Sequence, residues 1–222
     1  MAVVVSSAML RSVPLFASFP EEPLRLLATM VTRRSATRGS IIMAAGDPTD
    51  SLYILLSGRL KVMMSDADGK EVILSILGPG EFFGEMGLID DSPRSASVVA
   101  IEPCELMAIT RRDFKKCLAE NVEMAMAVMR GLVRRLREAD RKIGSLALLD
   151  VYGRVARLLL DMSETVDGQK MVTKRLPKQD IAKMIGASRE MVSRVMKDLQ
   201  RGGYIEMRGS TIVLHDTILL PD

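Results

Sequence analysis

Apolar and polar positions follow a helical rhythm between residues 112 and 149. Apolar or small residues recur there at steps of three and four, the a/d spacing of a two-stranded coiled coil. No Pro interrupts the run, and several intervening positions carry Arg, Lys or Glu. A stripe this narrow favours a helix that pairs with its own copy over a helix packed inside one domain. The stripe consists of Val122, Ala125, Met129, Leu132, Leu136, Ala139, Ile143 and Leu146.

Before this run, the pattern of residues 9–32 predicts short helices interrupted by Pro. From Arg33 onward, apolar residues recur with a period of two. Short apolar-polar runs are then separated by turns rich in Gly, Asp and Pro. Many short strands at regular spacing are typical of a β-barrel or jelly roll. The predicted strands cover residues 40–44, 52–56, 60–64, 72–77, 96–101 and 105–109.

After Leu149 the pattern is helical again and ends in a hairpin. Helices are predicted over residues 151–162, 176–183 and 188–201, with a hairpin-like turn at Asp167-Gly168 and strands at 204–207 and 211–214. The chain is therefore predicted to be an α+β protein of three parts. These are a β-roll domain (1–111), a dimerisation helix with a hinge (112–149) and a small C-terminal domain (150–222).

The net charge of +3 conceals an asymmetry along the chain. Residues 1–129 carry a balance of −3 and residues 130–222 a balance of +6, so the basic half is the one expected to meet phosphate. The two cysteines, Cys104 and Cys117, are too few for a Cys-ligated cluster and are expected to be reduced structural thiols. No leader or membrane-spanning run is evident, which favours a cytoplasmic protein without a membrane partner.

A candidate anion cradle lies between two predicted strands, in the segments Gly84-Glu85-Met86-Gly87 and Arg94-Ser95. Glycines let backbone N–H groups approach an anion, Arg94 offers a fork for phosphate oxygens, and Ser95 adds a hydroxyl. Glu85 would repel phosphate alone, but it suits a ligand that carries a hydroxyl beside its phosphate. The structural alternative is a Glu85–Arg94 salt bridge in a turn.

A candidate DNA-reading element follows Gly186, where a helix, a tight turn and a second helix are predicted. Ser188 is a natural N-cap for the second helix, and its apolar residues face inward. Arg189 and Glu190 fall in its first turn, where Arg suits guanine and Glu suits the cytosine amine. The alternative is a solvated charged face. The outward residues are Arg189, Glu190, Ser193, Arg194 and Lys197.

From about Leu15 to Leu214 the chain resembles the catabolite activator protein superfamily of bacterial transcription regulators. The motif Gly84-Glu85-Met86 with Arg94-Ser95-Ala96 is similar to the phosphate-binding cassette of cyclic-nucleotide-binding domains. The resemblance implies a β-roll, a dimerisation helix and a winged helix-turn-helix. It also implies that Glu85 binds the ribose 2′-hydroxyl, that Arg94 and Ser95 bind the cyclic phosphate, and that Arg189, Glu190 and Arg194 read a GTGA-like half-site. The resemblance also implies RNA polymerase as a partner, with the turns 66–71 and 165–175 as candidate contacts; the alternative is that both turns are solvated loops.

The sequence departs from cyclic-AMP-binding members at two positions of the long helix. Where those members carry two hydroxyl residues that contact adenine, this chain has Ala139 and Asp140. A carboxylate matches the adjacent N1–H and N2–H donors of guanine, so cyclic GMP or cyclic di-GMP rivals cyclic AMP as the ligand. Asp140 could equally pair with Arg137 or Arg141.

These patterns predict a homodimeric, ligand-responsive DNA-binding regulator with a cyclic nucleotide as its allosteric ligand and no other cofactor or metal. An enzyme is not expected, because no nucleophile–base pair or metal spacing is present and His215 stands alone. Two alternatives stay open: a family member that binds DNA without ligand or is inhibited by it, and a cyclic-nucleotide module that does not bind DNA.

Overall fold

The computed structural model describes residues 5–17, 19–174 and 176–215, and the chain divides into two compact units, Met1–Arg134 and Arg135–Asp222. The predicted three-part division remains a prediction, since the division between the units falls within a single helix. Among the described residues no helix combines the length and apolarity that crossing a membrane would need.

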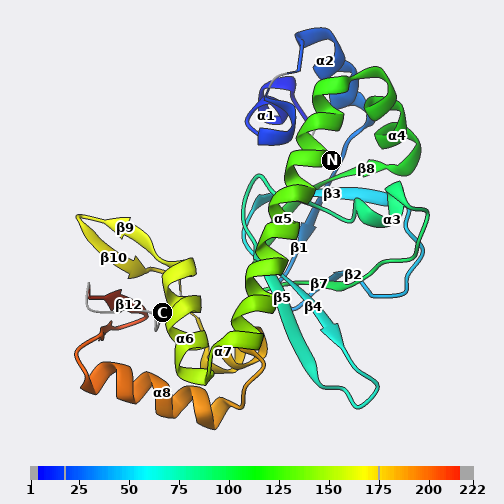
Figure 1. Ribbon diagram of the computed structural model, residues 1–222. Coiled ribbons are helices and arrows are strands. Elements are labelled where there is room, and N and C mark those ends of the chain that lie inside the picture. The colour runs from blue at the N-terminus through cyan, green and yellow to red at the C-terminus, as the bar shows by residue number, and fades with distance from the viewer. Residues whose placement is uncertain (1–4, 18, 175, 216–222) are drawn as a thin grey trace. The chain divides into compact units, whose positions relative to one another are not determined.

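The first unit opens with helices and then forms two four-stranded antiparallel sheets (Figure 1). The sheet orders are β1-β8-β3-β6 and β2-β7-β4-β5. The helices are α1 (Ser7–Arg11), the 3-10 turn η1 (Pro14–Phe16), α2 (Glu21–Met30), α3 (Met86–Ile89) and α4 (Arg111–Glu120). The strands are β1 (Thr32–Ala36), β2 (Ile41–Met43), β3 (Ser51–Ser57), β4 (Leu60–Ser65), β5 (Glu71–Leu77), β6 (Phe82–Phe83), β7 (Ser97–Ala100) and β8 (Cys104–Thr110).

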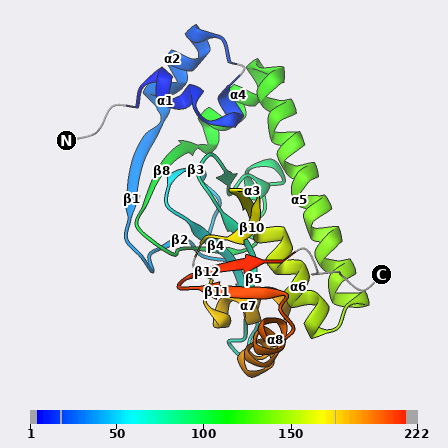
Figure 2. The ribbon, with the colours of Figure 1, turned by 90° about the vertical axis from the view of Figure 1, so that its left-hand side faces the viewer.

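Strand β3 shows how the alternating pattern builds this unit. Its residues Leu52 and Ile54 belong to a core shared with the helices, whereas Tyr53 and Leu55 belong to a second core between the sheets. Side chains of successive strand residues point to opposite faces, so a strand that is apolar at every position must be covered on both. Figures 1 and 2 show α1, α2 and α4 gathered beside the first half of α5, where they cover the first of these cores.

The predicted strands are confirmed to within two residues at their ends, but β1 and the two-residue β6 were not predicted as strands. The continuous helix predicted from residue 112 to 149 is wrong in one respect, because it is two helices: α4 and α5 (Val122–Leu148). Asn121 separates them with an extended backbone, φ −137° and ψ 102°. Its side-chain oxygen accepts a hydrogen bond from the Met124 amide at 2.9 Å, so it caps α5.

The predicted seam on α5 is largely exposed in the single chain. The buried positions of α5 are Met124, Val128 and Gly131, on another face of the helix. Leu132 departs from the expected stripe, since it packs partly against the core of the first unit. The exposed large apolar side chains are Val122, Met126, Met129, Val133, Leu136, Ile143, Leu146 and Leu148.

The second unit packs three helices and two hairpins around its own core. Beyond α5 it contains α6 (Val151–Met162), β9 (Glu164–Val166), β10 (Gln169–Val172), α7 (Lys178–Ile185), α8 (Arg189–Arg201), β11 (Ile205–Arg208) and β12 (Thr211–Leu214). The strands form one antiparallel sheet in the order β11-β12-β10-β9. The turn predicted at Asp167-Gly168 is confirmed, with positive φ values of 49° and 77° at these residues. The short strands on either side of it were not predicted.

Candidate functional site

The two glycines of the cassette make room for its other residues. Gly84 has a φ of +81°, and a side chain there would collide with the Arg94 guanidinium. A side chain at Gly87 would collide with the Ser92 carbonyl and the Thr49 hydroxyl. From the sequence, we explained these glycines by the close approach of backbone N–H groups to an anion. The structure gives them a second reason, the close packing of Arg94 and of the loop that follows.

Arg94 is 6% exposed and is held by groups from two segments of the first unit, Gly84 and residues 50–53. Its Nη1 donates to the Gly84 carbonyl at 2.8 Å, and its Nη2 donates to the Ser51 carbonyl at 2.7 Å. The same Nη2 lies 3.3 Å from a carboxylate oxygen of Asp50. The guanidinium also lies 5.8 Å from the centroid of the Tyr53 ring, within cation–π range. The charge of Arg94 is therefore fixed in position by neutral carbonyls and lies beside the Asp50 carboxylate.

The environment of Arg94 fits an anionic ligand. Carbonyl acceptors orient the guanidinium without neutralising its charge, and the Asp50 side chain is 76% exposed, so a phosphate could take its place. Glu85 is almost fully buried beside this site, directly before α3. Met86 and Ser95 are exposed, and the Ser95 hydroxyl lies 3.8 Å from the Met86 sulfur. The structure thus brings all five predicted cassette residues into one small region.

Ala139 and Asp140 do not belong to that region of the first unit. Both lie on the part of α5 that falls in the second unit, and both are exposed. Asp140 is spaced four residues from Leu136 and three from Ile143, so it lies on the same face of α5 as the exposed apolar stripe.

Sequence reasoning missed the residues that hold the cassette in place. Arg111 donates to the Thr49 carbonyl at 2.6 Å and to the Gly87 carbonyl at 3.3 Å, and it pairs with Asp91. Asp91 has a φ of +57° and also meets Lys115 at 3.0 Å. The two residues that pair with Asp91 lie one turn apart on α4. No local sequence pattern pairs Arg111 with Asp91, because the two residues lie 20 positions apart along the chain.

The helix-turn-helix prediction agrees with the geometry of the second unit. Gly186 ends α7 in the left-handed conformation with a φ of 65°. Ser188 is the N-cap of α8, and its hydroxyl accepts from the Met191 amide at 3.1 Å. Arg154 on α6 braces the turn, since its Nη1 donates to the Ile185 carbonyl at 2.9 Å. The Arg154 side chain of α6 therefore holds the end of α7, where the turn begins.

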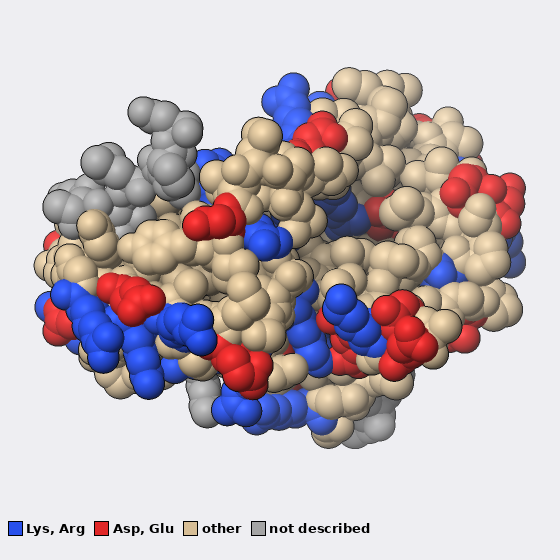
Figure 3. Space-filling model, turned by 60° about the horizontal axis from the view of Figure 1, so that its bottom comes forward, with Lys and Arg blue, Asp and Glu red and all other residues tan. Residues whose placement is uncertain are grey.

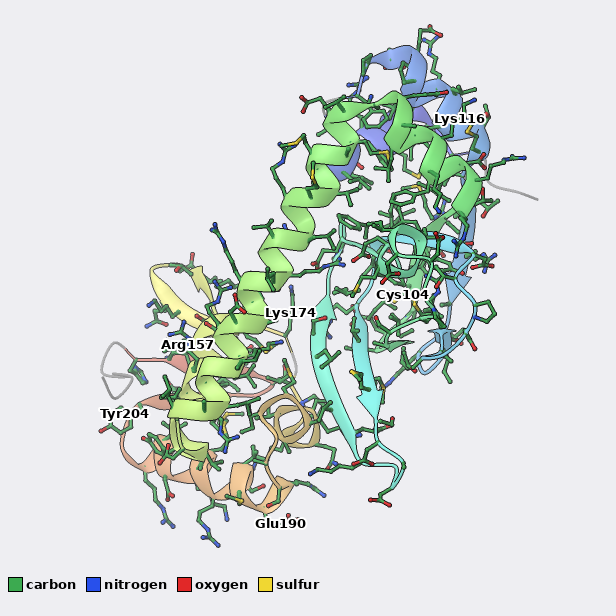
Figure 4. The ribbon with its side chains drawn as sticks, turned by 45° about the vertical axis from the view of Figure 1, so that its right-hand side comes forward. Cys104, Lys116, Arg157, Lys174, Glu190 and Tyr204 are labelled. Atoms are coloured by element: carbon green, nitrogen blue, oxygen red, sulfur yellow. The ribbon has the colours of Figure 1, made fainter. Side chains whose placement is uncertain are left out.

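The outward face of α8 presents the residues predicted to read DNA. Its buried side chains Val192, Val195, Met196 and Leu199 anchor the helix in the core of the second unit. On the opposite face, Arg189, Glu190, Ser193, Arg194 and Lys197 line a shallow surface hollow. Figure 4 shows Glu190 on the first turn of α8, and Figure 3 shows a group of Lys and Arg side chains at its lower left, with Asp and Glu side chains among them.

The two cysteines lack the environment of reactive thiols. Burial raises the pKa of Cys104, and burial with the nearby Asp113 and Glu120 carboxylates raises the pKa of Cys117. Within the described ranges no cluster of His, Cys, Asp and Glu has the geometry to hold a metal ion.

Comparison with known proteins identifies both halves of the chain. Residues 33–121 match the cyclic nucleotide-binding domain family, and residues 153–220 match the Crp-like helix-turn-helix domain family. The cAMP-activated global transcriptional regulator Vfr of Pseudomonas aeruginosa is 36% identical over 192 residues, which cover 83% of this chain and 90% of Vfr. The cAMP-activated global transcriptional regulator CRP of Pasteurella multocida is 37% identical over 185 residues, covering 80% of this chain and 87% of that protein.

Solved structures give the same result. The structure of CLP, the c-di-GMP responsive global regulator of Xanthomonas campestris, matches with a TM-score of 0.74 and 32% identity, covering 85% of this chain and 96% of CLP. The catabolite activator protein of Thermus thermophilus matches with a TM-score of 0.55 and 33% identity, covering 93% and 96% of the two chains. This chain belongs to the CRP/FNR family of transcription regulators.

Proposed function

We propose that this protein is a homodimeric transcription regulator whose binding to DNA is controlled by a cyclic nucleotide. The observation that carries the proposal is the presence, in one chain, of a cassette built around a buried Arg94 and a helix-turn-helix with an outward basic face. A cyclic-nucleotide module that does not bind DNA has no use for that helix-turn-helix. Relatives covering most of the chain are named as transcriptional regulators, which supports a regulator rather than an enzyme.

On DNA, we assign base contacts to three residues of α8 and phosphate contacts to three residues that lie beside them along the chain. Arg189, Glu190 and Arg194 would meet base edges of a GTGA-like half-site, and Ser188, Ser193 and Lys197 would approach the DNA backbone.

Arg189→Ala should therefore relax sequence preference at one base pair, at a cost of about 1–3 kcal/mol. Lys197→Ala should weaken all sequences about equally and reduce the salt dependence of binding. Binding isotherms on a set of single-base variants of one site separate the two effects.

The exposed apolar stripe of α5 supports a homodimer. Val122, Met129, Leu136, Ile143 and Leu146 would form the seam with the same residues of a second copy, and Leu132 would contribute from its edge. Two recognition helices must lie about 34 Å apart to enter successive major grooves of a pseudo-palindromic site.

RNA polymerase is proposed as the next partner, through the exposed turn at residues 66–71 or the hairpin at 165–174; residue 175 lies outside the described residues.

In the cassette, Arg94 and Ser95 would bind the cyclic phosphate, Glu85 would accept the ribose 2′-hydroxyl, and Gly84 and Met86 would line the site. Asp140 favours a guanine ligand, since its carboxylate can accept from both N1–H and N2–H. The relatives divide on this point: Vfr and CRP are named as cAMP-activated, and CLP as c-di-GMP responsive. The cassette motif is the one that the family uses for a 3′,5′-cyclic phosphate, and a cyclic dinucleotide, being larger, would need additional room.

Titration calorimetry on nucleotide-stripped protein against cyclic AMP, cyclic GMP and cyclic di-GMP tests the ligand. We expect micromolar binding of one of them, and a loss of about tenfold or more in affinity in Arg94→Ala, because a hydrogen bond to a charged group contributes about 1.5–3 kcal/mol. Arg25→Ala, which removes an exposed Arg of α2, serves as the control and should bind like the wild type. The absence of binding to all three nucleotides, with intact DNA binding, would instead support the alternative of a ligand-independent regulator.

Asp140→Ser tests the guanine assignment separately. If Asp140 contacts the base, this variant should lose preference for a guanine ligand and gain affinity for cyclic AMP. An unchanged order of the three affinities would reduce Asp140 to a surface charge and leave the cassette assignment intact.

A further inference from the structure

Gly131 marks the point at which α5 leaves the core of the first unit. The buried residues of α5, Met124, Val128 and Gly131, follow one helix face at steps of four and three. None of the described α5 residues beyond Gly131 is buried, and the first unit ends one turn later at Arg134. Gly131 is therefore the last buried residue of α5 in the first unit.

At this point the helix backbone lies directly against an aromatic ring. A Cβ at position 131 would be 2.7 Å from Cζ and 2.9 Å from Cε1 of Phe82, closer than carbon atoms can approach without a shift. Phe82 is only 6% exposed and packs in the same core as Met124 and Val128, so its ring has little freedom to retreat. A glycine inside a helix costs about 1 kcal/mol relative to alanine, and the contact with Phe82 gives this glycine its physical reason.

Phe82 leads directly into the cassette. It forms β6 with Phe83, pairs with Ile54 of β3, and stands two residues before Gly84. The preceding residue, Glu81, faces α5 as well, since its carboxylate lies 3.8 Å from the guanidinium of Arg134. The segment that enters the cassette thus meets α5 at Gly131 and again one turn later. The other described glycine of α5, Gly144, has no such neighbour, because no described atom would lie within 4 Å of a Cβ there.

We propose that Gly131 is a positioning residue, and that its contact with Phe82 transmits the state of the cassette to α5. The inference rests on the proposed function, in that the cassette is taken as the ligand site and α5 as the helix that leads to the DNA-binding unit. A shift of β6 moves the ring of Phe82, and a ring resting on helix backbone carries α5 with it. A side chain at residue 131 holds α5 away from β6 whatever the cassette contains.

The test compares Gly131→Ala, Phe82→Leu, the double variant and Gly144→Ala as a matched control on the same helix. A duplex selected by the wild-type protein from a random library is titrated with each variant, with and without cyclic AMP, cyclic GMP or cyclic di-GMP. The ratio of the DNA affinities with and without nucleotide is the coupling factor. Phe82→Leu removes the contact without adding an atom to α5, so it keeps the test valid even if Gly131→Ala folds poorly.

We expect Gly131→Ala and Phe82→Leu each to lower the coupling factor by about fivefold or more, the range typical of allosteric coupling. The double variant should recover to within about twofold of the wild type, because the smaller leucine side chain leaves room for the added methyl group. Gly144→Ala should match the wild type. A Gly131→Ala protein that couples like Gly144→Ala, or a double variant no better than the single ones, would overturn the inference.

If the wild type binds DNA with the same affinity with and without each of the three nucleotides, the proposed ligand control fails. The contact between Gly131 and Phe82 is then tested by the DNA affinity of the variants without nucleotide. There too, each single variant should shift the affinity and the double variant should restore it. No difference between Gly131→Ala and Gly144→Ala in that affinity would overturn the inference on its own.

Discussion

Arg94 illustrates what sequence can and cannot establish for a single residue. Its place in the motif with Gly84 and Glu85 marks it as a phosphate ligand by resemblance. Nothing in the sequence marks the Ser51 carbonyl as its partner, since this acceptor is a backbone atom 43 residues away. The cassette residues can thus be predicted from the chemistry of their side chains. The backbone carbonyls that hold those side chains in place cannot, because every residue has such a carbonyl.

Asp50 provides a prediction at this scale. Its exposed carboxylate lies beside Arg94 and would repel an incoming phosphate, so it competes with the ligand for the same charge. We expect Asp50→Asn to bind the nucleotide roughly two- to fivefold more tightly, a modest gain because exposed ion pairs contribute only about 0.2–1 kcal/mol. Calorimetric titration measures the change.

The matched control for Asp50 is Asp68→Asn, an exposed Asp in the turn between β4 and β5. It should leave nucleotide affinity unchanged. Weaker binding in Asp50→Asn would mean that the carboxylate holds Arg94 in its binding position rather than competing for it.

At the scale of elements, the pattern predicted well where the burial of a face was periodic. The inward face of α8 and the strands with two covered faces are examples. It failed at Asn121, because a single capping residue interrupts a helical run without altering its apolar rhythm. It also missed β6 and the strands β9 and β10 on either side of the predicted turn, since a two-residue strand has no period and most residues of β9 and β10 are exposed.

The start of α4 offers a prediction on pH. Thr110 caps the helix, and its hydroxyl donates to the Asp113 carboxylate at 2.7 Å. This hydrogen bond, with a smaller contribution from Arg112, holds the pKa of Asp113 below its usual value. A lowered folded-state pKa stabilises the protein above the usual Asp pKa of about 3.9, and the stabilisation is lost as the pH falls through the lowered value.

Asp113→Asn should therefore cost about 0.3–1 kcal/mol at pH 7, as expected for a carboxylate in the first turn of a helix. The difference from the wild type should shrink as the pH falls below 4. Urea denaturation at pH 7 and pH 3 measures it. An equal difference at both pH values would show that the charge of Asp113 contributes nothing to stability.

At the scale of the whole molecule, the change from a period of two to helical repeats predicted a β-rich part followed by a helical part, whereas the three-part division remains a prediction. The oligomeric state does not follow in the same way, because a single chain shows only which apolar surface is left exposed. That surface includes Leu136, 62% exposed, and Ile143, 65% exposed, on one face of α5. The apolar stripe on an otherwise charged helix is the physical basis for a second copy.

Leu136→Glu tests the seam, because a pair of carboxylates facing each other in an apolar interface is strongly unfavourable. Sedimentation equilibrium should show a dimer for the wild type and a monomer for this variant at micromolar concentration. Leu26→Glu, at a half-exposed apolar position on α2, is the matched control and should remain dimeric. A dimeric Leu136→Glu protein would place the interface elsewhere.

The central claim is that a nucleotide in the cassette controls the affinity of the helix-turn-helix for DNA, and fluorescence anisotropy of a wild-type-selected duplex tests it most directly. At fixed salt, one of the three cyclic nucleotides should change the DNA affinity by about fivefold or more, and Arg94→Ala should abolish that change. Equal DNA affinity with and without every one of the three nucleotides would contradict the account.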